Sequence, residues 1–161
     1  MKRLLLFLAT GFGSGYSKIF PGGLGALVGF IVALVFLIFP YYLRLIIILL
    51  FTTFSFFIAD WAEKYFQKKD PKQVTIDEIA GVLIGSLFVV KHGQTILWGF
   101  AIPICLLLLF WILLIFVIFD KIKLFPANKV QKLSGGLGIV LDDLIVGVYA
   151  GAIIFLISFF I

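Results

Sequence analysis

Two long apolar runs limit this chain to folds that can place them in a membrane. Ile102–Phe119 and Leu144–Ile161 contain no charged residue, and at a rise of about 1.5 Å per residue each nearly crosses a hydrocarbon core of about 30 Å. Hydrophobic residues make up 63% of the 161 residues and charged residues only 13%, against about a quarter charged in soluble domains. A soluble fold of this length cannot bury so much apolar surface, so we predict an integral membrane protein.

We expect a single all-α domain over residues 1–161 with about five transmembrane helices. The basic start Met1–Arg3 and the apolar Leu4–Ala9 mimic a short signal peptide, but no small-residue cleavage site follows, so we expect this segment to be retained. Polar residues and glycines separate five apolar segments, of which the third is short for a span. These segments are roughly Leu24–Phe39, Tyr42–Ala59, Ile76–Val90, Thr95–Phe119 and Ile139–Ile161.

The basic residues predict the orientation of these spans. With five crossings, the loops Asp60–Thr75 and Asp120–Gly138 share one side of the membrane with the segment before the first span. Every lysine and arginine except Arg44 and Lys91 then falls on that side. The positive-inside rule places this side in the cytoplasm. The same topology gathers all Asp and Glu residues on the cytoplasmic face.

Six of the eight acidic residues stand at the edges of the apolar segments. Carboxylates are costly near hydrocarbon and persist there with a partner, a metal or a function. Oxygen-rich sites suit hard cations such as Mg²⁺. The alternative is that the two acidic pairs cap helix N-termini. The predicted topology brings both acidic pairs and Asp120 to the same membrane face as Asp60, so we favour a metal site over capping. We call these acids the carboxylate cluster, which consists of Asp60, Asp77, Glu78, Asp120, Asp142 and Asp143.

Glycines follow both acidic pairs at helical spacing. Gly81 lies three residues after Glu78, and Gly147 lies four residues after Asp143, so each glycine falls roughly on the face of the acid before it. Small residues allow membrane helices to approach closely. We therefore predict that these glycines bring the carboxylates together, although ordinary helix packing would use them equally well.

Two further features are candidates for binding phosphate. The glycine-rich segment before the first span contains Gly13, Ser14, Gly15 and Lys18, and free amides, hydroxyls and a lysine near a helix N-terminus suit an anion. A flexible loop before a helix is the alternative. After the fourth span, Lys123 can hold a phosphate oxygen as a point charge.

The ordered motifs of the chain resemble those of the phosphatidylglycerophosphatase A family of bacterial membrane lipid phosphatases. The resemblance runs from about Thr10 to Gly151. It rests on GFGSG at 11–15, PGGLG at 21–25, Asp60, DPKQVTIDEIAG at 70–81, FDKIKLFP at 119–126 and GGLGIVLDDLIVG at 135–147. It implies an Mg²⁺-dependent enzyme of the bacterial cytoplasmic (inner) membrane, which converts the anionic lipid phosphatidylglycerophosphate to phosphatidylglycerol at the cytoplasmic face.

Three positions depart from the pattern of this family. Val117 stands where the family usually has an arginine, Leu124 replaces the proline after the lysine, and Gly23 replaces a threonine. Phosphate binding would therefore depend on Lys123, Lys18 and the metal. The reaction class is better defined by these motifs than the exact lipid.

Our mechanistic hypothesis assigns Mg²⁺ to Asp77, Glu78, Asp142 and Asp143, with Asp60 and Asp120 completing or orienting the site. A phosphomonoester needs a cation to neutralise its oxygens and to activate the attacking water. One carboxylate would accept the proton of that water. Direct attack by an aspartate, through an aspartyl-phosphate, is the alternative.

Two other functions compete with this one. A phosphatase for another lipid phosphate, such as phosphatidate, would use the same groups. A divalent-cation carrier would also need acids, but it predicts them within the spans or on both faces of the membrane. We expect neither a nucleic-acid ligand nor an obligate protein partner.

Overall fold

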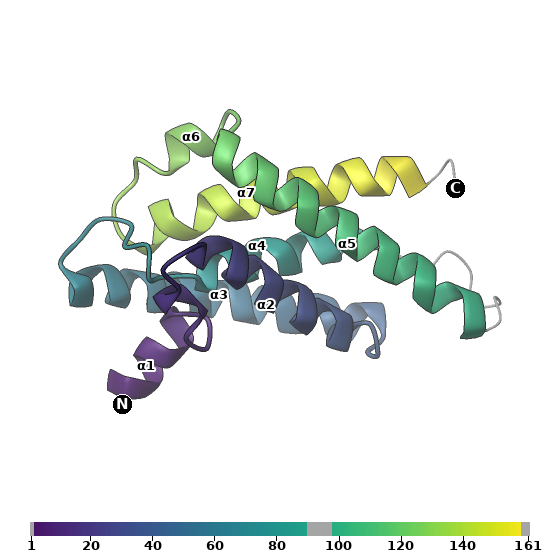
Figure 1. Cartoon of the computed structure of the whole chain (residues 1–161), viewed down its shortest axis with the longest axis horizontal. Helices are drawn as coiled ribbons and strands as arrows, with labels where there is room; N and C mark the ends of the chain where they lie inside the picture. Colours follow the sequence, from purple (N-terminus) through teal and green to yellow (C-terminus); the bar gives the residue numbers. More distant parts are fainter. Residues whose placement is uncertain (1, 90–97, 159–161) are drawn as a thin grey trace.

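The computed structural model describes residues 2–89 and 98–158, which form helices and contain no strand (Figure 1). The long elements lie lengthwise in one bundle, while α1 projects from one end of it. The elements are α1 (Lys2–Ala9), η1 (Ser14–Tyr16), α2 (Pro21–Phe36), α3 (Tyr41–Phe66), α4 (Ile76–Ser86), α5 (Trp98–Ile122), α6 (Ala127–Val130) and α7 (Gly136–Ser158). The predicted all-α class is confirmed for the described residues.

Three helices of the described chain are long and apolar enough to cross a membrane. They are α3, the Ile104–Ile122 part of α5, and α7. Helix α2 has 16 residues and α4 has 11, which is below the length of about 20 that a straight span needs. The prediction of five spans is therefore supported for three helices and stays a prediction for the other two.

The helix bounds differ from the predicted segments at several ends. Helix α3 continues to Phe66, so Asp60 lies inside a helix and not at the start of a loop. Helix α7 begins at Gly136, which places Asp142 and Asp143 in its second turn. The predicted turn at Lys91 and the limits at Val90 and Thr95 lie outside the described residues.

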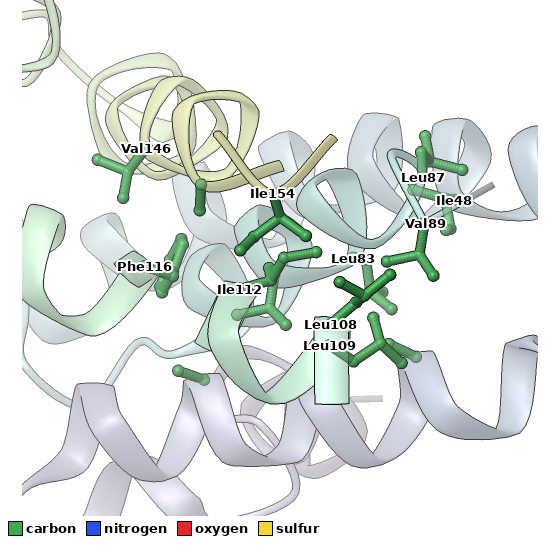
Figure 2. Packing of buried hydrophobic residues seen from close by; sticks show 14 of the residues in the cluster. Ile48, Leu83, Leu87, Val89, Leu108, Leu109, Ile112, Phe116, Val146 and Ile154 are labelled. Atoms are coloured by element: carbon green, nitrogen blue, oxygen red, sulfur yellow. The ribbon is translucent and has the colours of Figure 1, made fainter. Parts of the chain in front are cut away.

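Helix α4 is the central element of the bundle. It contacts α2, α3, α5 and α7, and most of its side chains are buried. Figure 2 shows the cluster around it, which includes Leu83 of α4, Ile112 of α5 and Ile154 of α7. A short helix surrounded in this way is stabilised by tertiary packing more than by its own helical propensity.

Glycines let α4 and α7 touch along their backbones. A Cβ atom added at Gly81 would lie 2.6 Å from the carbonyl oxygen of Asp143, and one added at Gly85 would lie 2.9 Å from that of Gly147. A Cβ at Gly147 would overlap the carbonyl of Gly81. The predicted close approach at Gly81 and Gly147 is confirmed, and it holds the acidic first turn of α4 against α7.

A buried arginine holds the other end of α4. Arg44 of α3 is 4% exposed, and its Nη2 donates a hydrogen bond to the carbonyl oxygen of Val89 at 2.9 Å. Its guanidinium also lies 5.4 Å from the ring centroid of Tyr41. Val89 follows the end of α4, where a buried carbonyl without a donor would be costly. Sequence analysis had used Arg44 only as a charge on one side of the membrane.

Replacement of Gly147 by alanine should destabilise the bundle. The added methyl group collides with the Gly81 backbone, and overpacking of this kind costs about 1–3 kcal/mol. We expect a lower midpoint of thermal unfolding in detergent for Gly147→Ala. Val148→Ala is the matched control, because Val148 is the next residue of α7 and is 41% exposed. Equal midpoints for the two variants would contradict the contact.

Replacement of Arg44 by leucine should also destabilise the protein. The change leaves the Val89 carbonyl without its donor, at a cost of about 1–3 kcal/mol. Thermal unfolding of Arg44→Leu measures this cost, and Arg44→Lys should recover part of it. An unchanged or higher midpoint for Arg44→Leu would mean that burying the guanidinium costs as much as its hydrogen bond contributes.

Candidate active site

Three carboxylates meet where α4 begins beside α7. Asp77 and Glu78 lie in the first turn of α4, and Asp143 lies in the second turn of α7. One oxygen from each lies within 4.8 Å of the others. Asp77 and Asp143 are 6% and 4% exposed. The structure thus brings together residues that the sequence separates by more than sixty positions, and we call Asp77, Glu78 and Asp143 the carboxylate triad.

Asp120, Lys123 and Asp142 border this triad. Lys123 has a φ of 50° and its amide donates to the Phe119 carbonyl oxygen at 2.8 Å, so it ends α5 in the left-handed conformation common at helix C-termini. Its Nζ donates to Oδ2 of Asp142 at 3.1 Å. The carboxyl group of Asp120 lies close to that of Asp143.

Lys123 carries the positive charge next to these acids. Partial burial of its amine acts to lower the pKa, but the carboxylates of Asp142, Asp120 and Asp143 outweigh that effect and hold the pKa of Lys123 above its usual value. Among the described residues, Nζ of Lys123 is the basic group that forms an ion pair with one of these buried acids, Asp142. It is therefore protonated throughout the physiological range.

Several carboxylate oxygens of the site have no hydrogen-bond partner among the described residues. Oδ1 of Asp77, Oε2 of Glu78 and Oδ1 of Asp142 are buried and accept no hydrogen bond in the described structure. A buried ionised oxygen without a donor or cation is strongly unfavourable. The carboxylate triad faces one position and two of its members have a free oxygen, which is the kind of donor set that a hard divalent cation uses. The residues therefore fit a Mg²⁺ ion.

Helix capping does not explain Asp142 and Asp143. Helix α7 begins at Gly136 and has no acidic residue in its first turn, so neither acid can reach the free amides at the start of the helix. Asp77 and Glu78 do lie in the first turn of α4, where they also offset the helix dipole. Capping alone thus accounts for at most one of the two acidic pairs.

The structure places Asp60 apart from the carboxylate triad. Its Oδ2 accepts a hydrogen bond from Nζ of Lys64 at 2.7 Å. It lines an open pocket of about 470 Å³ together with Glu63, Lys68 and Gly135. A direct contribution of Asp60 to the metal site stays a prediction, and its structural contact is with the start of α7.

The glycine-rich segment packs against the residues that lead into α4. Oγ of Ser14 lies 3.1 Å from Oγ1 of Thr75, in hydrogen-bonding distance, and the amide of Thr75 donates to the Ala9 carbonyl at 2.9 Å. A Cβ at Gly15 would overlap the Gln73 carbonyl. Gly13 has a φ of 94°, which favours glycine.

These contacts change the interpretation of the phosphate-binding candidates. Ser14 and Gly15 face the protein, while Lys18 is exposed. The observed contacts support α4, and phosphate binding by Gly13, Ser14, Gly15 and Lys18 stays a prediction. Sequence analysis missed Thr75, the fully buried N-cap position of α4. A threonine directly before an acidic helix start is the signal that would have identified it.

Comparison with known proteins agrees with this arrangement. The phosphatidylglycerophosphatase A family matches residues 7–158. A protein from Bacteroides thetaiotaomicron named as a putative phosphatidylinositol-3-phosphatase is 34% identical over 93% of this chain and 92% of its own length. Phosphatidylglycerophosphatase A from Haemophilus influenzae is 30% identical (94% and 87% of the two chains), and that from Escherichia coli is 27% identical (94% and 81%). No solved structure matches the chain.

An apolar helical bundle with three helices long enough to cross a membrane and a group of carboxylates that could hold a metal ion defines the class of a membrane protein with a candidate metal site. The chain belongs to the phosphatidylglycerophosphatase A family, and it is a lipid phosphatase. The resemblance noted from the motifs is confirmed.

Replacement of Lys123 by glutamine should lower stability by the same amount at pH 7 and pH 10. The variant leaves Asp142 without its ion pair, and because Lys123 is one-third exposed we expect a loss of about 1 kcal/mol. A raised folded pKa means that the stabilisation persists until the pH passes that value. Lys132→Gln, an exposed lysine elsewhere, is the control in thermal unfolding. A difference that vanishes between pH 7 and pH 10 would contradict the raised pKa.

Proposed function

We propose that this protein hydrolyses phosphatidylglycerophosphate to phosphatidylglycerol and phosphate in a Mg²⁺-dependent reaction. The observation that carries the proposal is the carboxylate triad, in which one buried oxygen of Asp77 and one of Glu78 have no partner among the described residues. Membership of the family supplies the reaction class. We further propose that the site faces the cytoplasm in the bacterial inner membrane, as the basic residues suggest.

Asp77, Glu78 and Asp143 are the residues that would hold the metal. Asp142 remains the fourth candidate ligand, although in the structure its Oδ2 pairs with Lys123. When bound, Mg²⁺ neutralises charge on the phosphate oxygens and lowers the pKa of a water molecule. Asp120, whose carboxyl group lies close to that of Asp143, would help to position that carboxylate, as outer partners of metal ligands usually do.

The remaining steps fall to side chains of the chain itself. One carboxylate of the cluster accepts a proton from the attacking water, whose oxygen forms a bond to phosphorus. The bond between phosphorus and the glycerol oxygen breaks, that oxygen takes a proton from solvent and leaves as the free alcohol, and the carboxylate returns its proton to solvent. Lys123 stabilises the negative charge of the phosphate, because its amine is held beside Asp142 and stays protonated.

A phosphoinositide is the second candidate substrate. The relative from Bacteroides thetaiotaomicron is named for a phosphatidylinositol 3-phosphate activity, and the departures at Val117, Leu124 and Gly23 lie in motifs that flank the site. Both lipids are phosphomonoesters on an anionic lipid, so the same carboxylates serve either one. Phosphatidate is the third lipid that a direct comparison should include.

Phosphate release by an Asp143→Asn variant tests the proposal. We expect wild-type protein in detergent to release phosphate from phosphatidylglycerophosphate only with Mg²⁺, and faster than from phosphatidate or phosphatidylinositol 3-phosphate. Asp143→Asn should lower kcat by more than about 100-fold, since even outer partners of metal ligands contribute about 10–100-fold. Glu63→Gln is the matched control, because Glu63 lies outside the carboxylate triad.

The other outcomes distinguish the alternatives. Faster phosphate release from phosphatidylinositol 3-phosphate than from phosphatidylglycerophosphate would show that the preferred substrate is a phosphoinositide. A phosphorylated protein trapped by acid quench would replace water attack by an aspartyl-phosphate. The cation carrier would be favoured if folded protein released no phosphate from any of these lipids and carried Mg²⁺ across the membrane of proteoliposomes.

A further inference from the structure

An apolar groove lies between the end of α5 and the second half of α7. Its volume is about 500 Å³. Phe119, Leu124 and Phe125 line one side of it, and Tyr149, Ile153 and Leu156 line the other. The hydroxyl of Tyr149 donates to the Phe125 carbonyl oxygen at 2.9 Å, so the polar atom of this residue is already satisfied. We call this feature the α5–α7 groove.

The α5–α7 groove continues the acidic site along one face of α7. Asp142, Tyr149, Ile153 and Leu156 follow one another at intervals of seven, four and three residues, which places them on the same side of a helix. At a rise of 1.5 Å per residue, Tyr149 lies about 10 Å and Leu156 about 21 Å from Asp142 along the axis. The apolar lining therefore begins where the charged site ends.

Positive charge borders the end of the groove that faces the site. Lys123, the residue before Leu124, is bonded to Asp142. Nζ of Lys129 lies 4.9 Å from the ring centroid of Phe125. Two amines thus stand beside the residues that line the α5 side of the α5–α7 groove, and one of them, Lys123, belongs to the acidic site. This order of charges matches a molecule with an anionic head and an apolar tail.

We propose that the α5–α7 groove holds an acyl chain of the lipid phosphate while its head group reaches Lys123 and the carboxylate triad. This inference rests on the proposed function. Because the chain leaves bilayer hydrocarbon for an equally apolar surface, its transfer gains little free energy. The groove acts by alignment: it fixes where the phosphate stands relative to the carboxylates, and misplacement of reacting groups by about 1 Å can cost about 100-fold in rate.

Filling the groove tests the proposal through acyl-chain selectivity. Ala152 lines the groove, and Ala152→Phe places a ring inside it. We expect the ratio of kcat/KM for dioleoyl phosphatidylglycerophosphate to that for the dibutanoyl lipid to fall about tenfold, within the range that misalignment produces. Val148→Phe adds the same ring at an exposed position of α7 outside the groove and should preserve the ratio. An unchanged ratio in Ala152→Phe would overturn the proposal.

Photolabelling of the wild-type protein gives a readout that needs neither a variant nor turnover. Phosphatidylglycerophosphate and phosphatidylcholine, each with the same diazirine-bearing acyl chain, are compared in lipid nanodiscs without Mg²⁺. We expect the anionic lipid to label α7 between Tyr149 and Leu156 several-fold more strongly. Equal labelling by both lipids would show a groove that faces bulk lipid only, and would overturn the acyl-chain site.

The two experiments separate failure of the inference from failure of the proposed function. Absence of phosphate release by wild-type protein from either chain length rejects the hydrolysis of this lipid. Selective labelling would in that case still assign the groove to an anionic lipid. Release with normal chain selectivity in Ala152→Phe, together with unselective labelling, rejects the groove and leaves the proposed hydrolysis intact.

Discussion

The carboxylates buried between α4 and α7 are the constraint on which the rest of the structure depends. Removing an ionised carboxylate from water costs several kcal/mol unless a cation or hydrogen-bond donors replace the solvent. Lys123 offsets this cost for one oxygen of Asp142, while one oxygen of Asp77 and one of Glu78 have no such partner in the part of the chain that the structure describes. A bound cation would stabilise these buried carboxylates, and a cation is also what the hydrolysis of a phosphomonoester requires.

The features around the site serve to keep these acids in place. Backbone contact at Gly81 and Gly147 sets the separation of α4 and α7. The glycine-rich segment before α2 supports the start of α4 through Ser14 and Thr75. In the sequence these motifs look like separate binding elements. In the structure they all contact α4 and hold this short helix at a fixed position.

Much of this arrangement can be predicted from the sequence, and the features that cannot be predicted depend on contacts between distant parts of the chain. Apolar runs identify the helices, and helical spacing correctly relates Gly81 and Gly147 to the acids. Helix ends are less predictable: α3 continues past Asp60 through Trp61 to Phe66, because an amphipathic end still makes good helix. The burial of Arg44 against Val89 depends on tertiary contacts between elements distant in sequence, and no local pattern reveals it. The contact of Ser14 with Thr75 is hidden for the same reason.

The length of helix α4 also sets the position of its two acids. Its 11 residues span about 16 Å at 1.5 Å per residue, with two carboxylates in its first turn and, just past its last residue, a carbonyl held by Arg44. Because both ends are held by neighbouring helices, the distance from the Arg44 anchor to the acids is set by the number of residues between them. Insertion or deletion of one residue in α4 would therefore shift the acids by one step and rotate them away from Asp143, even though every side chain of the site remained present.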